Sequence, residues 1–299
     1  MNFFILEVLI GGLLTGVLYS LVALGFVLIF KASGVFNFAQ GAMCLFAALA
    51  LVRLMEVMPT ALALLATAAL MLALAVAIER LVLRPLVNQE GLILFMATIG
   101  ITFFINGFGQ ALFGSDVYAL DLGIPKNPLI LFEGLVPGGL LVNEFDLWTA
   151  VVAGLLVAVL AVFFQRTRIG RALRAVADDH QAAQSVGIPL RHIWVIVWSV
   201  AGLVALAAGI IWGSKLGVQF SIALVALKAL PVLMLGGLTS VPGAIVGGLV
   251  VGAGEKLSEV FLGPYLGGGI ENWFAYVLAL LVLLVRPQGL FGERIIERV

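Results

Sequence analysis

Long apolar segments separated by short polar stretches run through almost the whole chain. Seven of them hold 18 or more residues without Asp, Glu, Lys or Arg, which is long enough for a helix to cross the hydrocarbon core of a bilayer. They do not alternate between polar and apolar residues as barrel strands do, so helices are favoured. The segments are 8–30, 32–52, 57–78, 91–115, 147–165, 192–214 and 229–254, with a shorter one at 272–285.

A turn signal divides the last long segment. Residues 236–243 read Gly-Gly-Leu-Thr-Ser-Val-Pro-Gly, and clusters of Gly, Pro, Ser and Thr mark turns. We therefore expect spans near 217–236 and 243–262 and a last span near 270–286. The sequence predicts an all-α polytopic membrane protein, with one transmembrane domain over 1–299 and about nine transmembrane helices. The number is eight if the segment before the turn is re-entrant.

Composition agrees with a membrane protein. Of the 299 residues, 63% are hydrophobic and 11% are charged, against about 25% charged in soluble domains. The formal net charge is zero, so nothing points to a nucleic-acid partner. The single cysteine, Cys44, cannot form an internal disulfide. The first residues lack the basic start of a cleaved signal peptide, so we expect the first apolar segment to remain as a span.

Charge asymmetry orients the spans, because Lys and Arg concentrate in short cytoplasmic loops. The connection 165–191 carries five arginines, whereas the connection 114–146 carries Lys126 as its one basic residue among five acidic ones. We expect 165–191 to be cytoplasmic and 114–146 to be an external loop. With the predicted spans, this places the N-terminus outside and the C-terminus in the cytoplasm. The five arginines are Arg166, Arg168, Arg171, Arg174 and Arg191.

Two sets of uncharged polar residues lie within apolar segments. Asn37 and Gln40 open the second segment, where Asn37 can cap the helix with its side-chain oxygen. The other set, spaced four residues apart, forms a polar stripe that can bond to neighbouring helices. Polar side chains at membrane depth also tend to face a cavity, so both sets are candidates to line a translocation path. The second set is Thr98, Thr102, Asn106 and Gln110.

A charged cluster follows late in the eighth predicted span. Glu255 and Glu259 share one helix face, and Lys256 can pair with Glu259 three residues on. Charges at membrane depth are costly unless they are paired or interfacial. One interpretation is an interfacial cluster near the outer surface. The other is a proton or ion relay with Lys228, as in a secondary transporter.

The connection 165–191 has the features of a docking surface. Gly170 and Gly187 bracket it, and Asp178 or Asp179 can cap a short helix that ends near Gly187, with Pro189 beyond preventing its continuation. Its apolar residues recur at helical spacing, so it is either an amphipathic helix on the inner leaflet or a coupling helix for a cytoplasmic partner. The acidic pair favours docking. The apolar residues are Ile169, Leu173 and Val176.

Enzyme motifs are missing from the sequence. There is no Gly-Lys pair, hence no usual phosphate-binding loop, and the two histidines, His180 and His192, are not surrounded by further metal ligands. We expect no catalysis, no cofactor and no metal in this chain. The energy for transport would then come from another subunit.

Four stretches resemble the permease subunits of branched-chain amino acid ABC importers, the LivH-type member of the LivH/LivM pair. They are Gly16–Gly25, Phe36–Gly41, Arg166–Ala172 with Gly187-Ile188, and Leu235–Ala244. Many relatives carry His where Gln40 stands, and related systems carry urea, short amides or aromatic compounds.

The resemblance implies a type II importer fold in a bacterial inner membrane. It implies a homologous LivM-like permease subunit, two cytoplasmic ATP-binding subunits and a periplasmic binding protein that selects the substrate. The region 171–188 would be the coupling segment, with Gly170, Arg171, Arg174, Asp178, Asp179 and Gly187 as the coupling residues.

We thus expect half of the path of an ATP-driven importer of branched-chain or other hydrophobic amino acids. The alternatives are an ion-coupled secondary transporter that uses Lys228, Glu255 and Glu259, and a structural or channel-like membrane subunit.

Overall fold

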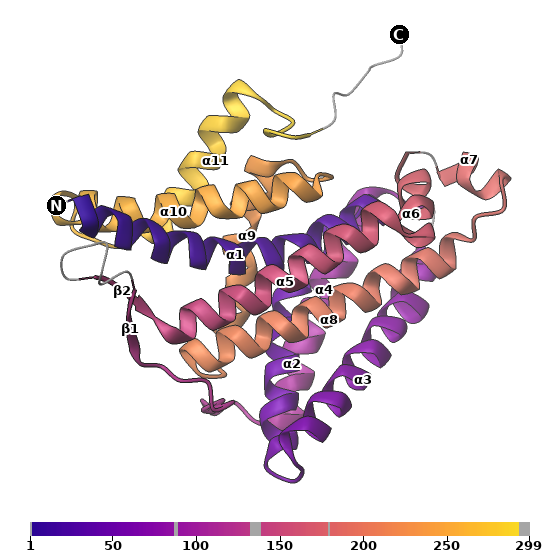
Figure 1. Ribbon diagram of the computed structural model, residues 1–299. Coiled ribbons are helices and arrows are strands. Elements are labelled where there is room, and N and C mark those ends of the chain that lie inside the picture. Colours follow the sequence, from indigo (N-terminus) through magenta and orange to yellow (C-terminus); the bar gives the residue numbers. More distant parts are fainter. Residues whose placement is uncertain (1, 87–88, 132–138, 179, 293–299) are drawn as a thin grey trace. The chain divides into compact units, whose positions relative to one another are not determined.

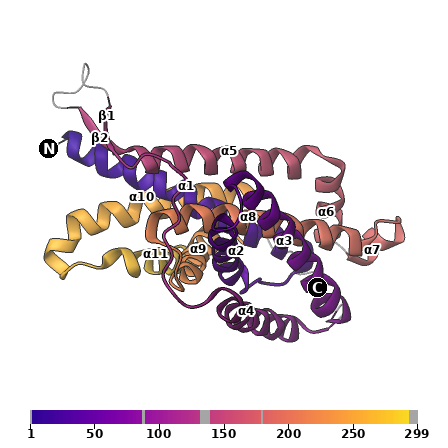
Figure 2. The ribbon, with the colours of Figure 1, turned by 90° about the horizontal axis from the view of Figure 1, so that it is seen from below.

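The computed structural model describes residues 2–86, 89–131, 139–178 and 180–292, and most of them are helical. The chain divides into two compact units, and Figures 1 and 2 show the helices from which they are built. The first unit consists of residues 1–23, 123–158 and 228–299, and the second of residues 24–122 and 159–227. Three helices contribute residues to both units: α1 (Asn2–Ser33), α5 (Glu144–Arg166) and α9 (Ile222–Gly236).

Helix α2 (Gln40–Met55) forms the centre of the second unit. It packs against α3 (Thr60–Ile78), α4 (Gly91–Phe113) and α8 (Leu190–Leu216), and every residue from Gln40 to Val52 is buried. A helix that is apolar all round is buried on all sides. Its single cysteine, Cys44, is accordingly a buried free thiol.

Glycines bring α1 and α10 (Val241–Leu266) together in the first unit. A Cβ on Gly248 would lie 2.7 Å from the carbonyl oxygen of Gly16, and a Cβ on Gly252 would overlap the backbone of Gly12 and Gly16. Small residues spaced by one helical turn let two backbones approach closely. Gly248 and Gly252 therefore let α10 pack closely against α1.

The predicted turn between α9 and α10 is confirmed. The two helix axes are bent by 116° at this break, and the hydroxyl of Ser240 caps α10 by accepting a hydrogen bond from the Gly243 N–H at 3.0 Å. The C-terminal segment caps α9, because the Leu290 N–H donates to the Leu235 carbonyl oxygen at 2.8 Å. Both helix ends at this turn are therefore capped, the end of α9 by the C-terminal segment and the start of α10 by Ser240.

Five helices of the described residues are long and apolar enough to cross a membrane singly. The bent pair α9–α10 adds a sixth if it forms one broken span. Two further apolar helices are shorter, α2 with 16 residues and α11 (Phe274–Val285) with 12. The all-α membrane fold is thus confirmed, while the expected number of nine spans stays a prediction.

A short antiparallel hairpin interrupts the connection 114–146. Strand β1 (Pro128–Leu131) pairs with β2 (Leu140–Asn143), with Pro128 opposite Asn143. The remaining elements are short: the π-helical turn η1 (Glu79–Leu83), the 3-10 turns η2 (Arg84–Leu86) and η3 (Ile270–Asn272), and the helices α6 (Arg168–Asp178) and α7 (His180–Ser185).

Candidate functional site

A tight corner joins α5 to α6. The hydroxyl of Thr167 accepts a hydrogen bond from the Gly170 N–H at 3.1 Å, which is the position of a helix N-cap. Gly170 packs so close to the last turn of α5 that a Cβ there would overlap the carbonyl group of Phe164. Glycine is therefore required by space at this corner, and it fixes the direction in which α6 leaves α5.

Arg174 is part of the same corner. Its guanidinium donates to the carbonyl oxygens of Phe164 at 2.8 Å and of Gln165 at 3.3 Å. The last carbonyl groups of a helix have no partner within the helix, and basic side chains bind them favourably. Of the predicted coupling residues, Gly170 and Arg174 thus build the corner itself.

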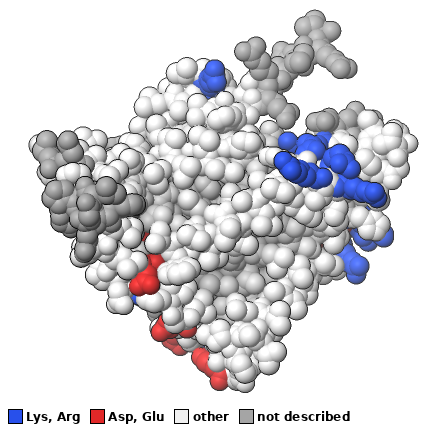
Figure 3. Space-filling view, viewed as in Figure 1, with Lys and Arg blue, Asp and Glu red and all other residues white. Residues whose placement is uncertain are grey.

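Helix α6 has two different faces. Leu173 and Val176 are buried and Ile169 is half-buried, so the predicted apolar strip faces the protein. Arg168 and Arg171 are exposed on the other side, and basic side chains gather over this helix in the space-filling view (Figure 3). The corner therefore presents a rigid basic surface.

The end of the segment also has the predicted geometry. Helix α7 stops at Ser185, and Gly187 takes the left-handed conformation with φ of 84°. Its N–H donates to the Gln184 carbonyl oxygen, and Pro189 then leads into α8. Asp179 lies outside the described residues, as does the side chain of Asp178, so the proposed helix cap by either residue stays a prediction.

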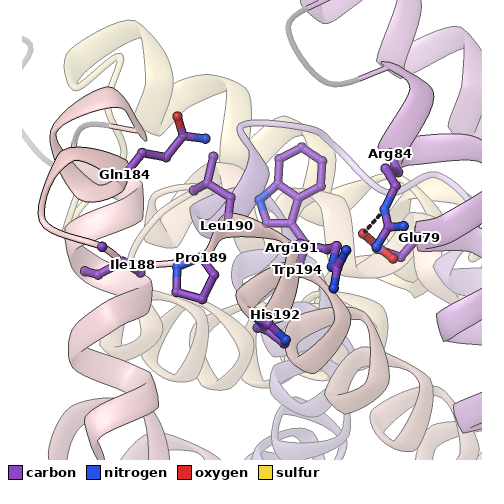
Figure 4. A pocket seen from close by; sticks show the side chains of 10 residues that line it. Glu79, Arg84, Gln184, Ile188, Pro189, Leu190, Arg191, His192 and Trp194 are labelled. Atoms are coloured by element: carbon purple, nitrogen blue, oxygen red, sulfur yellow. Dashed lines mark ion pairs between the residues drawn. The ribbon is translucent and has the colours of Figure 1, made fainter.

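A pocket of about 720 Å³ opens between η1 and the α7–α8 connection (Figure 4). Glu79 lies at its edge with 1% of its side chain exposed, and Arg84 Nε lies 3.7 Å from Glu79 Oε1. The other carboxylate oxygen, Oε2, is buried and has no hydrogen-bond partner among the described residues. Further lining residues are Gln184, Gly187, Ile188, Pro189, Leu190, Arg191, His192 and Trp194.

The structure brings Asn37 and Gln40 together in the break between α1 and α2. Asn37 Nδ2 donates to Gln40 Oε1 at 3.1 Å, and Gln40 Nε2 donates to the Ala201 carbonyl oxygen at 3.3 Å. Asn37 Oδ1 accepts from the Ala39 N–H at 3.1 Å, and the N-cap position of α2 is Ala39 rather than Asn37. The predicted cap is therefore wrong by two residues. Both amides are fully buried.

The polar stripe on α4 turns gradually outward. Thr98 is fully buried and donates to the Phe36 carbonyl oxygen at 3.1 Å, Thr102 and Asn106 are half-buried, and Gln110 is exposed. Four residues exceed one helical turn by about 40°, so a spacing of four drifts around the helix. The buried Asn106 Oδ1 has no hydrogen-bond partner among the described residues. A path-lining role for these residues and for Asn37 and Gln40 stays a prediction.

The charged cluster of the first unit is more connected than the sequence suggested. Glu255 is only 3% exposed and accepts a hydrogen bond from the Tyr19 hydroxyl at 2.9 Å. The expected pair between Lys256 and Glu259 is wrong. Lys256 Nζ instead lies 3.4 Å from Glu271 Oε2.

Glu259 is engaged by backbone groups instead of Lys256. Its two oxygens accept from the Gly269 N–H at 2.9 Å and the Glu271 N–H at 3.0 Å. Gly267, Gly268 and Gly269 all have left-handed backbones, with φ of 88°, 79° and 73°. This run of glycines turns the chain back over the end of α10 and delivers Glu271 to Lys256. Lys228 Nζ donates to the Glu271 carbonyl oxygen at 3.5 Å.

Several of these residues were missed by the sequence analysis. Two of them could have been found from local sequence. Thr167 is a hydroxyl residue three positions before Gly170, and Glu79 is a carboxylate directly before the basic end of the third span. Tyr19 and Glu271 carried no such signal, since their partners are distant in the sequence. Within the residues that the structure describes, no group of three or more His, Cys, Asp or Glu side chains could hold a metal ion.

The chain is similar to known permeases over nearly its whole length. Residues 8–286 match the family described as "Branched-chain amino acid transport system / permease component". The chain is 30% identical to the high-affinity branched-chain amino acid transport system permease protein BraD of Pseudomonas aeruginosa, with 98% of each chain covered.

Two further relatives belong to distant organisms. The high-affinity branched-chain amino acid transport system permease protein LivH of Escherichia coli is 28% identical, over 99% of this chain and 98% of that protein. A probable branched-chain amino acid transport permease protein LivH of Methanocaldococcus jannaschii is 26% identical, over 95% of this chain and 92% of that protein. The similarity therefore extends from bacteria to an archaeon.

Proposed function

Because the chain belongs to the family of branched-chain amino acid transport system permease components, we propose that it forms half of the path through which an ATP-driven importer moves branched-chain or other hydrophobic amino acids. It is a multi-pass membrane protein and the permease subunit of an ABC importer. ATP hydrolysis belongs to separate ATP-binding subunits, which act together with a substrate-binding protein. The other half of the path would come from a homologous LivM-like permease.

The distribution of charge within the second unit supports the proposed orientation. The end of this unit at which α5 and α3 finish and α8 begins carries Arg80, Arg84, Arg166, Arg171 and Arg191 among its basic residues. The last turns of α2 and α8 each carry one basic residue in the described part of the chain, Arg53 and Lys215. Because basic residues concentrate on the cytoplasmic side, we place the α6–α7 end in the cytoplasm and the 114–146 connection outside. The N-terminus is then outside and the C-terminus inside.

The observation that carries the coupling role is the rigid basic surface at the α5–α6 corner. Gly170 and Arg174 hold α6 in one direction, which lets Arg171 meet a partner without loss of order. Asp178 and Asp179 follow on the same segment, and Gly187 ends it. ATP-driven closure of the ATP-binding subunits would push this segment and rock the attached helices.

The substrate is inferred from the relatives and from the sequence resemblance. The binding protein would select it, and the permease would supply a path of low affinity. Importers of urea, short amides or aromatic compounds remain the alternative class, because Gln40 replaces the His of many relatives. The buried side chain of Gln40 donates to the Ala201 carbonyl oxygen, and this contact does not favour one class of substrate over another.

The function is tested by transport in proteoliposomes that contain the permease pair, the ATP-binding subunits and the substrate-binding protein. We expect ATP-dependent uptake of radiolabelled leucine that urea or a short amide does not compete. Full uptake after replacement of Arg171, Arg174, Asp178 and Asp179 together by Ala would contradict the coupling role of this segment. Uptake of urea in place of leucine would contradict the substrate.

The ion-coupled alternative is tested in proteoliposomes that contain the permease without the other subunits. Glu255 is buried, and its Oε1 has no hydrogen-bond partner in the described part of the chain. This unbonded oxygen is the observation that favours an ion or proton relay. The permease alone, placed under a proton or sodium gradient, is expected to take up no leucine. Uptake without ATP-binding subunits would support the relay with Lys228 and Glu259.

A further inference from the structure

The pocket beside the α7–α8 connection has the chemistry of a binding site for a small zwitterion. Its volume of about 720 Å³ lies within the range of small-molecule sites, about 300–1,000 Å³. All of its lining residues belong to the second unit. We propose that it binds a free α-amino acid from the cytoplasm, at a place separate from the residues predicted to line the path.

Glu79 supplies the site for the ammonium group. It is almost completely buried, and its Oε2 has no hydrogen-bond partner among the residues that the structure describes. An unsatisfied buried carboxylate oxygen is costly, more so than a neutral group. A ligand ammonium would supply both the missing donor and the opposite charge.

Arg84 covers Glu79 only loosely. Its Nε is 3.7 Å from Oε1, which is too long for a hydrogen bond, and its side chain is 40% exposed. Figure 4 shows the two side chains facing each other at one side of the pocket. An arriving ammonium therefore replaces the Arg84 head at Glu79, and the freed guanidinium remains beside the ligand carboxylate.

The opposite wall of the pocket, formed by residues 188–191, would bind the carboxylate and the apolar side chain of the ligand. Arg191 brings a second guanidinium at the start of α8, where the free N–H groups of a helix also favour an anion. Ile188, Pro189 and Leu190 form an apolar surface next to it. An α-amino acid carries its two charges one carbon apart and its apolar side chain on that same carbon. The adjacent opposite charges of Glu79 and Arg84 match this spacing better than the wider spacing of a phosphoethanolamine headgroup.

A ligand in this pocket would regulate transport, because the pocket adjoins the predicted coupling segment. This inference rests on the proposed function. The α7–α8 connection forms one wall of the pocket and directly follows the α6–α7 segment. A bound amino acid would brace this connection and oppose its movement. Imported amino acid that accumulates inside would then slow its own uptake.

Binding is measured by titration calorimetry on the permease pair with its ATP-binding subunits in nanodiscs, without the substrate-binding protein. The probes are L-leucine, isovalerate, which lacks the ammonium group, and isoamylamine, which lacks the carboxylate. We expect saturable binding of leucine alone, weakened at least about tenfold, or by about 1.4 kcal/mol, in Glu79→Gln and in Arg191→Gln. Arg53 pairs with Glu56 in the last turn of α2 and does not line the pocket, so Arg53→Gln should leave binding unchanged.

Other results overturn the proposal. They are the absence of leucine binding, equal binding of either half-molecule, leucine binding that both variants leave unchanged, and loss of leucine binding when phosphatidylethanolamine is added to phosphatidylglycerol nanodiscs. If the Glu79→Gln protein does not fold, leucine binding by Arg191→Gln decides the proposal, because Arg191 is exposed. Failure here leaves ATP-dependent uptake intact, so it is distinct from failure of the proposed function. Leucine preloaded inside proteoliposomes should slow uptake by the parent and not by Arg191→Gln.

Discussion

Charged side chains gather in two regions of this apolar chain, and the two regions use them differently. Around α10 and η3 the charges bind one another and the backbone: Tyr19 donates to Glu255, Lys256 pairs with Glu271, and Glu259 binds two backbone N–H groups. Around α6, within the residues that the structure describes, Arg174 is bound to the end of α5, while Arg168 and Arg171 are exposed above a buried apolar strip. Charges that are bound within the fold stabilise it, whereas exposed charges on a rigid element are available to a partner. This difference favours docking to a motor subunit over an ion relay.

The largest expected effect comes from the α5–α6 corner itself. In Gly170→Ala the new Cβ overlaps the Phe164 carbonyl group, a backbone group that can move only if the corner opens. We expect a destabilisation of about 1–3 kcal/mol and loss of leucine uptake to the background of liposomes without ATP. Gly107→Ala on α4 is the matched control, because nothing lies within 4 Å of a Cβ there. Equal uptake by the two variants would show that the corner is not needed.

A second substitution asks whether the charged cluster is structural. Glu255→Leu removes the acceptor of the Tyr19 hydroxyl, so the free energy of unfolding should fall by about 1–3 kcal/mol. Glu255→Gln keeps an acceptor and removes only the charge. We expect its ATP-driven uptake to stay within about twofold of the parent, as measured in proteoliposomes. Abolished uptake in a well-folded Glu255→Gln protein would instead indicate a relay.

Arg171→Ala separates docking from folding. Because Arg171 is exposed on α6, stability should change by no more than about 0.5 kcal/mol. Uptake should fall by at least about tenfold through weaker contact with the ATP-binding subunit, since a charged contact contributes about 1.5–3 kcal/mol. Arg53→Ala serves as the control for loss of an arginine outside α6, because Arg53 is half-exposed at the end of α2 and pairs with Glu56. A matching loss of uptake in both variants would remove the case for α6.

The smallest effect is expected at the surface of the charged cluster. Lys256 and Glu271 are 44% and 38% exposed and 3.4 Å apart. Exposed ion pairs contribute about 0–1 kcal/mol, so Lys256→Gln should lower the thermal unfolding midpoint only slightly and leave uptake unchanged. A large drop in the unfolding midpoint would mean that the Lys256–Glu271 pair is more strongly coupled to Glu255 than its exposure indicates.

The helices and the turn between α9 and α10 could be predicted because their causes are local. The turn signal at 236–243 and the amphipathic spacing of Leu173 and Val176 act over a few residues, and both are confirmed. Apolar length predicted helices, but the expected spans at 32–52 and 270–286 form helices of only 16 and 12 residues. Gly187 was likewise predicted from its place before Pro189, and its left-handed φ agrees with a helix end.

The partners of side chains could not be predicted in the same way. Lys256 had a suitable partner in Glu259 at i+3, and nothing in the spacing shows that three left-handed glycines return Glu271 to it. Arg174 was predicted as a coupling residue that docks to a partner, whereas its guanidinium binds the end of α5. Tyr19 and Glu255 are separated by 236 residues, so only the packing of α1 against α10 brings them together.

The central claim is that the α6–α7 segment faces the cytoplasm and touches an ATP-binding subunit. The single native cysteine is buried, so Arg171→Cys can be labelled selectively with a membrane-impermeant maleimide in oriented vesicles. We predict labelling in inside-out vesicles only, and protection when the ATP-binding subunits are added back. Labelling of intact right-side-out vesicles, or labelling that the ATP-binding subunits leave unchanged, would contradict the account.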